Sequence, residues 1–219
     1  MEVLMKKILW LVVFFFFFAG FLQASEKVFY FDSPEELGAF YPAQTAKCGT
    51  LSEWLLIDAP DAPSGKKALL VRPNPHTNHG SCFNVFITRQ VRAKDLRLEV
   101  WVKAFKGRED QGGGPIWRVQ DEDNYYVVRW NPLEDNFRLY YVKNGHRRML
   151  ASARVKAPAH KWHRITVEHR GDLIKCYFDG RLLLEKRDRT FVRSGGVGLW
   201  SKADAQTGFD LLKIQILSP

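Results

Sequence analysis

The body of this 219-residue chain carries almost no helix signal, no internal repeat and only three cysteines. Because no long amphipathic segment with a period of about 3.6 residues is present, the pattern favours a fold built from strands. A propeller is excluded, since it requires a repeat of about forty residues. Three cysteines allow one disulfide and leave one thiol over.

Short strand patterns recur through the chain and are separated by turn residues. They predict about a dozen strands, near 27–32, 54–58, 68–72, 82–88, 96–105, 116–120, 125–131, 137–142, 162–168, 173–178, 182–186, 196–200 and 209–217. The Asp179-Gly180 dipeptide between two of them is a strong hairpin signal. We predict a single all-β domain, 25–219, with the two-sheet antiparallel sandwich of a jelly roll.

Only one long apolar run is present, from Ile8 to Leu22, and it follows Lys6 and Lys7. As a helix it would span about 22 Å, against roughly 30 Å for the hydrocarbon core of a bilayer. We interpret residues 1–24 as a cleaved signal peptide, with a membrane anchor as the competing interpretation. No cysteine follows the run, so a bacterial lipoprotein anchor lacks its attachment residue. The mature chain is expected to begin near Ser25, to hold no integral membrane span and to be secreted or periplasmic.

The net charge is strongly positive, at +9. Removal of residues 1–24 takes away two lysines and one glutamate, which leaves +8. A basic surface favours acidic partners such as polyanionic glycans, anionic lipid headgroups and nucleic acid. The export signal and the lack of any RNA-recognition or zinc-finger pattern argue against nucleic acid. The simpler interpretation is that the lysines and arginines lie solvated on strand faces and in turns.

The segment from Gly112 to Val142 is the most informative one, because it indicates three strands joined by two acidic turns. Successive side chains alternate across a sheet, so each strand has two faces. One face is apolar and the other carries arginine, amide or phenol groups, while Trp117 and Val119 lie opposite the arginine of the first strand. The predicted polar faces hold Ile116, Arg118 and Gln120, then Tyr125, Val127, Arg129 and Asn131, then Arg138, Tyr140 and Val142.

These polar faces suit a sugar, which presents an apolar C–H face and a ring of hydroxyls to aromatic and planar hydrogen-bonding groups. Whether the arginines share one face depends on the strand register. The competing interpretation is that the arginines only keep the sheet soluble and that the tryptophan belongs to the core. The candidate ligand-binding residues are Arg118, Arg129, Asn131, Arg138, Tyr140, Trp200 and Lys202.

The cysteines suit an oxidising compartment. Cys48 and Cys82 both lie in loop or strand-entry sequence, and we predict that they form the disulfide. Cys176 lies in the alternating segment LIKCYF, which indicates a buried core residue rather than a reactive thiol.

Catalytic residues are not assigned. Glycosidases need two carboxylates flanking the scissile bond. The acidic groups cluster instead at turns, as Asp121-Glu122-Asp123 and Glu134-Asp135, and the Glu-x-Asp-x-x-Glu strand motif of jelly-roll glucanases is absent. Classical hydrolysis of that type is therefore disfavoured. No nucleophile motif accompanies His160 or His163.

No cofactor or metal is expected, although Ca²⁺ remains an alternative. Asp121, Asp123 and Asn124 offer oxygen ligands, as do Asp204 and Asp210, but neither spacing matches a full calcium loop. His76 and His79 lie in a loop without a third zinc ligand in view.

Three runs carry a resemblance to a known family. They are GGGPIWRVQDEDNYYVVRWNPLEDNFRLYYVKNG, WHRITVEHRGDLIKCYFDGRLLLEKRD and SGGVGLWSKADAQTGFDLLKI. Together they resemble concanavalin A-like or laminin-G-like jelly rolls of exported bacterial proteins, closest to the uncharacterised domains labelled 3-keto-disaccharide hydrolase. The resemblance covers 29–217 and implies a carbohydrate partner. The expected function is a glycan-binding or envelope interaction module, and the alternative is a glycoside hydrolase-like enzyme that acts on a (3-keto-)glycoside.

Overall fold

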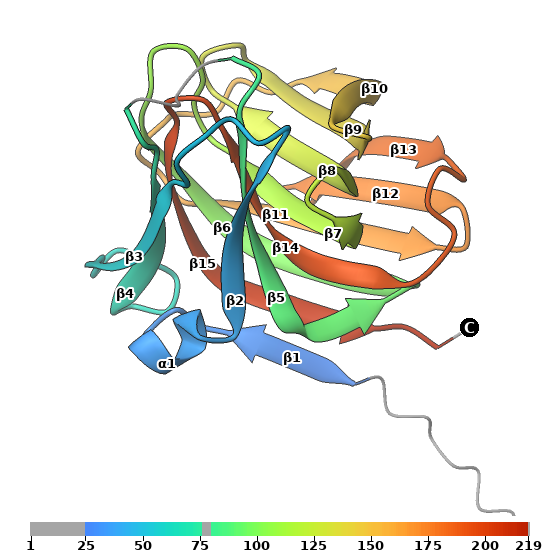
Figure 1. Ribbon diagram of the computed structural model, residues 1–219, viewed down its shortest axis with the longest axis horizontal. Coiled ribbons are helices and arrows are strands. Elements are labelled where there is room, and N and C mark those ends of the chain that lie inside the picture. The colour runs from blue at the N-terminus through green and yellow to red at the C-terminus, as the bar shows by residue number, and fades with distance from the viewer. Residues whose placement is uncertain (1–24, 76–79, 219) are drawn as a thin grey trace, which may run out of the picture.

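The computed structural model describes residues 25–75 and 80–218 and shows an all-β sandwich of two antiparallel sheets (Figure 1). This confirms the predicted fold class. Beyond the strands, the described residues contain one short helix, α1 (Pro34–Leu37). None of the described helices is long and apolar enough to cross a membrane. The expected signal peptide, 1–24, and both histidines of the HTNH loop lie outside the described residues.

Sheet A has eight strands in the order β13-β12-β11-β6-β15-β4-β3, and β1 pairs with β15 beside this path. β6 and β15 form its centre, where both strands are long and alternate apolar and polar residues. The strands are β1 (Glu26–Phe29), β3 (Glu53–Asp58), β4 (Lys67–Arg72), β6 (Leu96–Lys106), β11 (His163–Arg170), β12 (Leu173–Phe178), β13 (Arg181–Arg187) and β15 (Gln206–Ile216).

Sheet B has seven strands in the order β10-β9-β8-β7-β14-β5-β2. The last strands at one edge form a meander, because short turns join β7 to β8, β8 to β9 and β9 to β10. The strands are β2 (Phe40–Thr45), β5 (Phe83–Ala93), β7 (Gly114–Asp121), β8 (Asn124–Asn131), β9 (Asn136–Lys143), β10 (His146–Arg154) and β14 (Gly195–Lys202).

The main core fills the space between the sheets. It takes alternate residues of each sheet, and its largest members include Trp117, Trp130 and Phe209, all fully buried. Cys176 is a free, buried cysteine of this core, as predicted. Removal of this apolar surface from water is the main force that holds the two sheets together.

The predicted alternation is correct for β8 and β9 but wrong for β7. Tyr126, Val128 and Trp130 face the core, and Tyr125 and Val127 face away from it. On β7 the register shifts after Trp117, and the next residue adopts a φ of 47°. One extra residue in a strand is a β-bulge, which redirects the side chains that follow. Val119 therefore lies on the face opposite to Trp117, whereas the sequence pattern placed them together.

Local turn chemistry follows the sequence closely. Asp179 and Gly180 connect β12 to β13 with φ values of 47° and 81°, the left-handed conformations that a two-residue hairpin turn requires. Cys48 and Cys82 form a disulfide with their Cα atoms 5.7 Å apart, the pairing expected from the sequence. The bridge attaches the loop after β2 to the start of β5.

Candidate functional site

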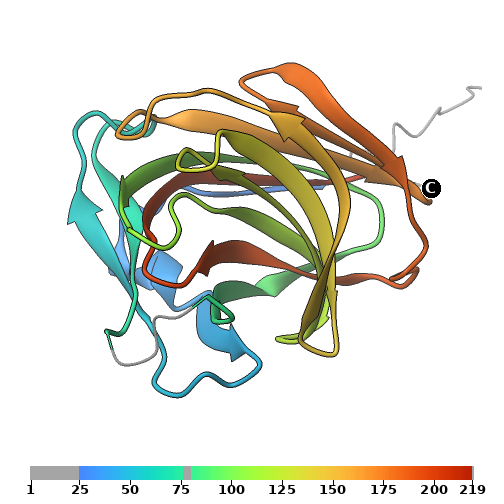
Figure 2. The ribbon, with the colours of Figure 1, turned by 90° about the horizontal axis from the view of Figure 1, so that it is seen from above.

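Sheet B curls, so that its outer face, the one turned away from sheet A, is closed at one side (Figure 2). The turn between β7 and β8 meets the loop after β2 across this face. Thr45 Oγ1 donates to the carbonyl of Glu122 over 2.7 Å and lies 2.7 Å from the hydroxyl of Tyr125. The amide of Ala46 donates to Asp123 Oδ1 over 2.8 Å. These bonds close the outer face between the β7–β8 turn and the loop after the edge strand β2.

An apolar floor covers the outer face of sheet B. Its members are buried although no third sheet packs on them, because the curl and long polar side chains shield them from water. The rings of Phe83 and Trp200 lie 5.3 Å apart. The floor residues are Phe83, Val85, Ile87, Ile116, Val119, Tyr125, Val127, Tyr140, Val142 and Trp200.

Arg147 of β10 lies across this floor. Its guanidinium carbon is 4.4 Å from the ring centre of Tyr140, 5.0 Å from that of Phe83 and 5.8 Å from that of Trp200. Cation–π attraction holds a guanidinium in such a position. Burial lowers the pKa of Arg147. Its Nη1 is buried without a hydrogen-bond partner, and within the described residues it has no ion-pair partner.

Arg129 and Arg138 stand opposite each other on β8 and β9. Both donate to Glu134 Oε2, each over 3.1 Å, and Arg129 also donates to Asn136 Oδ1 over 3.0 Å. Burial opposes the charge on Glu134, but hydrogen bonds from Asn136 and Arg129 outweigh it and lower the pKa of this carboxyl. Arg129 is 1% exposed, and its Nε is buried without a partner.

Asp110, Asn131 and Lys202 form a largely buried polar group at the ends of β8 and β14. Asn131 Nδ2 donates to Asp110 Oδ1 over 3.0 Å, and Lys202 Nζ lies 3.0 Å from Asp110 Oδ2. Burial raises the pKa of Asp110, although the charges of Arg129 and Lys202 oppose this. The neighbouring loop is held by Asp204, whose carboxylate accepts the amides of residues 108, 109 and 110.

We call these polar groups the outer-face cluster. It combines four cations with two carboxylates, so it carries an excess of positive charge above an aromatic floor. A shallow hollow of about 430 Å³ adjoins it at Glu134, Arg138 and Ser152. The cluster consists of Asp110, Arg129, Asn131, Glu134, Asn136, Arg138, Arg147 and Lys202.

Six of the seven residues predicted to bind ligand lie on this face. Tyr140 and Trp200 belong to the floor and are 5% and 0% exposed, so they support Arg147 rather than present an open stacking surface. The other four belong to the cluster, namely Arg129, Asn131, Arg138 and Lys202.

Arg118 lies elsewhere. The bulge turns its fully buried side chain to one end of the sandwich. There Nε donates to the carbonyl of Lys94 over 2.8 Å, Nη1 to that of Phe191 over 2.7 Å, and Nη2 to that of Gly171 over 2.8 Å and to Asp95 over 3.2 Å. Arg118 thus joins three turns and does not contact the outer-face cluster.

Four members of the cluster went unrecognised in the sequence, among them Asn136, which follows the acidic turn Glu134-Asp135. Arg147 follows the turn Asn144-Gly145, and extension of the strand pattern past that turn would have found it. Glu134 was predicted only as a turn carboxylate. Asp110 follows a glycine-containing loop, and no local signal marks it as buried.

The other residues considered in the sequence, as ligands for a metal ion or as a catalytic histidine, do not form a site among the described residues. Among the residues that the structure describes, no group of three or more His, Cys, Asp or Glu side chains is placed to hold a metal ion. Asp210 accepts the amide of Ser64 over 2.7 Å and so lies apart from Asp204. His163 lies 2.8 Å from Asp179 and 3.0 Å from the carbonyl of Pro158, which engages both ring nitrogens.

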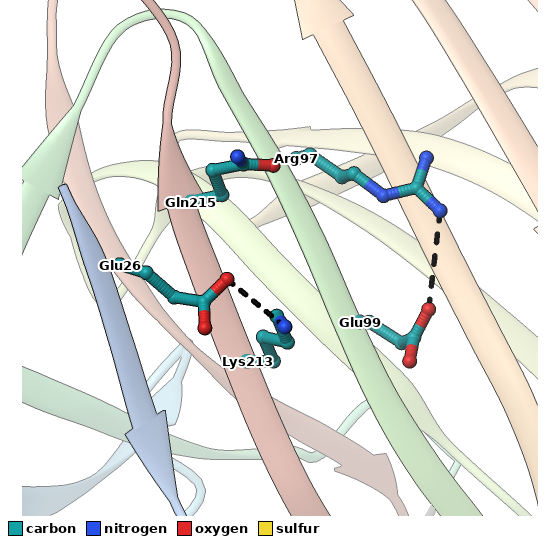
Figure 3. Close-up of a pocket in the computed structure, with 5 residues that line it drawn as sticks. All are labelled: Glu26, Arg97, Glu99, Lys213 and Gln215. Atoms are coloured by element: carbon teal, nitrogen blue, oxygen red, sulfur yellow. Dashed lines mark ion pairs between the residues drawn. The ribbon is translucent and has the colours of Figure 1, made fainter. Parts of the chain in front are cut away.

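The outer face of sheet A has a hollow of its own, of about 300 Å³ (Figure 3). Its charged side chains form pairs of opposite sign. Lys213 pairs with Glu26 over 2.9 Å, and Arg97 lies 4.0 Å from Glu99. Figure 3 shows the five lining side chains, with Gln215 beside the two pairs, over β1, β15 and β6. Paired charges of this kind are typical of a solvated sheet face.

No family model and no curated protein matches this chain. Solved structures do match in fold. The carbohydrate binding module CBM66 from Bacillus subtilis has a TM-score of 0.61 and 19% identity, over 78% of this chain and 94% of that one. A protein of unknown function with a galectin-like fold, also from Bacillus subtilis, has a TM-score of 0.63 and 9% identity, over 86% and 94%.

A third match is domain 4 of AbnA, a GH43 extracellular arabinanase from Geobacillus stearothermophilus, solved in complex with arabinotriose. Its TM-score is 0.52 and its identity 13%, over 80% of this chain and 82% of that domain. At these identities the likeness establishes the fold. It agrees with the jelly-roll sandwich that the sequence resemblance implies.

Proposed function

We propose that this protein is an exported glycan-binding module whose ligand lies on the outer-face cluster. One observation carries the proposal: Arg129 Nε and Arg147 Nη1 are buried N–H donors without an acceptor, and both belong to the same polar cluster. A buried donor left unpaired costs roughly 1–3 kcal/mol. Hydroxyl or carboxylate oxygens of a sugar are acceptors of the right kind for these donors.

The charges of the cluster favour an acidic glycan. Glu134 is shared by Arg129 and Arg138, and Asp110 is held by Lys202 and Asn131. The charge of Arg147 therefore remains for a ligand carboxylate, which a guanidinium binds through two parallel hydrogen bonds. Names of structural neighbours support the general class, because one is a carbohydrate binding module and another was solved with a bound arabinotriose.

Binding is tested with a matched pair of polymers, polygalacturonate and its methyl ester, which differ in carboxylate charge. We expect calorimetry to detect the acid form and to find at least tenfold weaker binding of the ester. Arg147→Ala should weaken binding of the acid form more than tenfold, because it removes the uncommitted guanidinium. Arg97→Ala on sheet A is the control, with thermal unfolding as the check on folding. Equal affinity of both variants for polygalacturonate would exclude the outer-face cluster.

An enzymatic role is the second candidate, and one observation favours it. Asp110 and Glu134 are near neighbours whose environments move their pKa values apart, upward by burial for Asp110 and downward by hydrogen bonds for Glu134. An acid and a base at one site are distinguished in this way. Turnover of a (3-keto-)glycoside that Asp110→Asn and Glu134→Gln both abolish, with ligand binding retained, would establish the enzyme. Binding without product release supports the module.

Export is part of the proposal and rests on residues 1–24. The apolar run after Lys6 and Lys7 and the cysteine pair joined in a disulfide both suit an extracytoplasmic site. Fractionation of a bacterial host with N-terminal sequencing tests it. We expect a released chain that begins near Ser25, and an intact N-terminus in the cytoplasmic fraction would overturn it.

A further inference from the structure

One end of the sandwich gathers exposed cations from separate turns. They come from the end of β5 and the turn to β6, from the turn between β11 and β12, and from the connection between β13 and β14, which all lie on the right in Figure 1. Buried Arg118 joins the same three turns through their carbonyls. We call this the basic end, and its exposed cations are Arg92, Lys94, Arg170, Arg187, Arg189 and Arg193.

Three carboxylates at this end are already engaged. Asp95 accepts Arg118 Nη2 over 3.2 Å and the amide of Gly171 over 2.9 Å. Asp172 accepts Arg187 and Arg189 over 2.5 and 3.1 Å. Asp188 accepts the hydroxyl of Tyr126 over 2.5 Å. Six exposed cations and the buried Arg118 outnumber these three carboxylates and the acidic β7–β8 turn, Asp121-Glu122-Asp123, that borders this end beside Ser194.

The basic end also has a hollow and an exposed apolar side chain. The hollow, of about 490 Å³, is lined by Lys94, Gly171, Asp172, Arg187, Arg189 and Val192. Val192 is 56% exposed. Cations that surround an apolar tip match the boundary between headgroups and acyl chains in a bilayer.

The start of the domain lies at this same end. The carbonyl of Ser25 accepts the amide of Ile216 over 2.9 Å, and Leu217, the residue after β15, donates to the carbonyl of Asp95 over 3.0 Å. In the sequence, the apolar run from Ile8 to Leu22 ends three residues before Ser25. Before residues 1–24 are cleaved, a membrane that holds this run would therefore face the basic end.

We propose that the basic end docks on a membrane surface that carries anionic phospholipid headgroups. The outer-face cluster lies at the opposite end of β14, since Gly195 begins that strand beside Ala93 and Lys202 ends it beside Phe83. A docked molecule keeps that cluster directed away from the bilayer. Each lysine or arginine near an anionic surface contributes about 1 kcal/mol, which corresponds to a factor of roughly five in affinity.

The test measures sedimentation of the released chain, 25–219, with vesicles of phosphatidylcholine alone or with 30 mol% phosphatidylglycerol, a proportion on the order of that in anionic membranes. Without the apolar run, binding depends on the basic end, which distinguishes the two kinds of vesicle. At roughly fivefold for each cation, we expect a quadruple variant at the basic end to lose the preference for anionic vesicles by about 600-fold. The variant combines Arg92→Gln, Lys94→Gln, Arg170→Gln and Arg193→Gln.

A matched control removes four exposed cations from the other end. It should keep the preference for anionic vesicles, and both variants should keep their binding of polygalacturonate, which separates this proposal from the glycan site. Equal binding to both vesicles, equal losses in the two variants, or loss of polygalacturonate binding in the first variant would overturn membrane docking. The control combines Lys106→Gln, Arg108→Gln, Lys156→Gln and Lys161→Gln.

Discussion

The two outer faces of the sandwich differ in how far their charged side chains are exposed to water. On sheet A the pair Lys213–Glu26 joins side chains that are 49% and 40% exposed, at 2.9 Å. On sheet B the pair Lys202–Asp110 joins side chains that are 14% and 1% exposed, at 3.0 Å. A lysine–carboxylate pair of nearly the same length is thus exposed to water on one face and buried on the other. Sheet B therefore withdraws from water a kind of ion pair that sheet A leaves exposed.

The cause of the difference is curvature and what it covers. Sheet A has no covering layer, so its polar residues meet water and pair loosely. Sheet B curls until the β7–β8 turn meets the loop after β2, which shields an aromatic floor and the arginines above it. In a shielded site electrostatic interactions are stronger and unpaired donors are more costly.

The largest expected effect compares the two lysine pairs. Lys202→Met should lower the free energy of unfolding by about 3 kcal/mol at pH 8, because it removes the ion-pair partner of the buried Asp110 carboxylate. The loss should shrink at pH 5, since burial raises the pKa of Asp110 and the neutral acid needs no partner. Lys213→Met should lower it by less than about 1 kcal/mol at both values. Urea unfolding measures both, and equal losses would erase the distinction between the faces.

The next effect concerns the interior between the two faces. Burial, helped by the charge of Arg118, lowers the pKa of His169 to about 3, and its Nδ1 accepts the Trp117 indole N–H over 2.9 Å. The unfolded chain binds a proton below about pH 6.5 and the folded chain does not, so this stability is present above that pH and is lost as pH falls. From pH 7 to 5 the expected loss is about 2 kcal/mol.

His169→Gln is the matched variant for this measurement, because its amide oxygen can still accept the indole N–H. Unfolding of both proteins at pH 5 and 7 should show a pH dependence that is about 2 kcal/mol smaller in the variant. An identical pH dependence would mean that His169 titrates normally in the folded protein.

The smallest effect is expected on sheet A. Arg97→Gln should change the free energy of unfolding by less than about 1 kcal/mol, because the pairs it makes with Glu99 and Glu168 are solvated. Affinity for polygalacturonate should stay within about twofold of the parent protein, a difference of under 0.5 kcal/mol. A tenfold loss of affinity would move the candidate site to the hollow of sheet A.

Much of the fold could be predicted because its signals are local. Alternation in β8 and β9, the Asp179-Gly180 turn and the disulfide between Cys48 and Cys82 depend on neighbouring residues or on cysteine number. The bulge at Arg118 was missed, since one added residue leaves no trace in composition while it moves every later side chain.

The candidate site was predicted in part. Arg129, Asn131 and Arg138 follow from alternation, because adjacent strands of a meander bring the same face together. Arg147 and Asp110 did not follow, since their place depends on the curl of the sheet and on the path of a loop. Burial of the floor was also missed, because an apolar outer face has the same sequence pattern as a strand buried on both sides.

The amino-acid sequence was enough to predict every strand except β2 and β10, most of the turns, the basic balance of charge and, apart from β7, which residues alternate toward the core. These properties follow from the two-residue alternation along strands and from short turn motifs. Only the tertiary structure decided which arginines meet, because register and curvature arise from packing between distant strands. The tertiary structure places Arg118 at one end of the sandwich, where it joins three turns. It places Arg129 and Arg147 elsewhere, above the aromatic floor of sheet B.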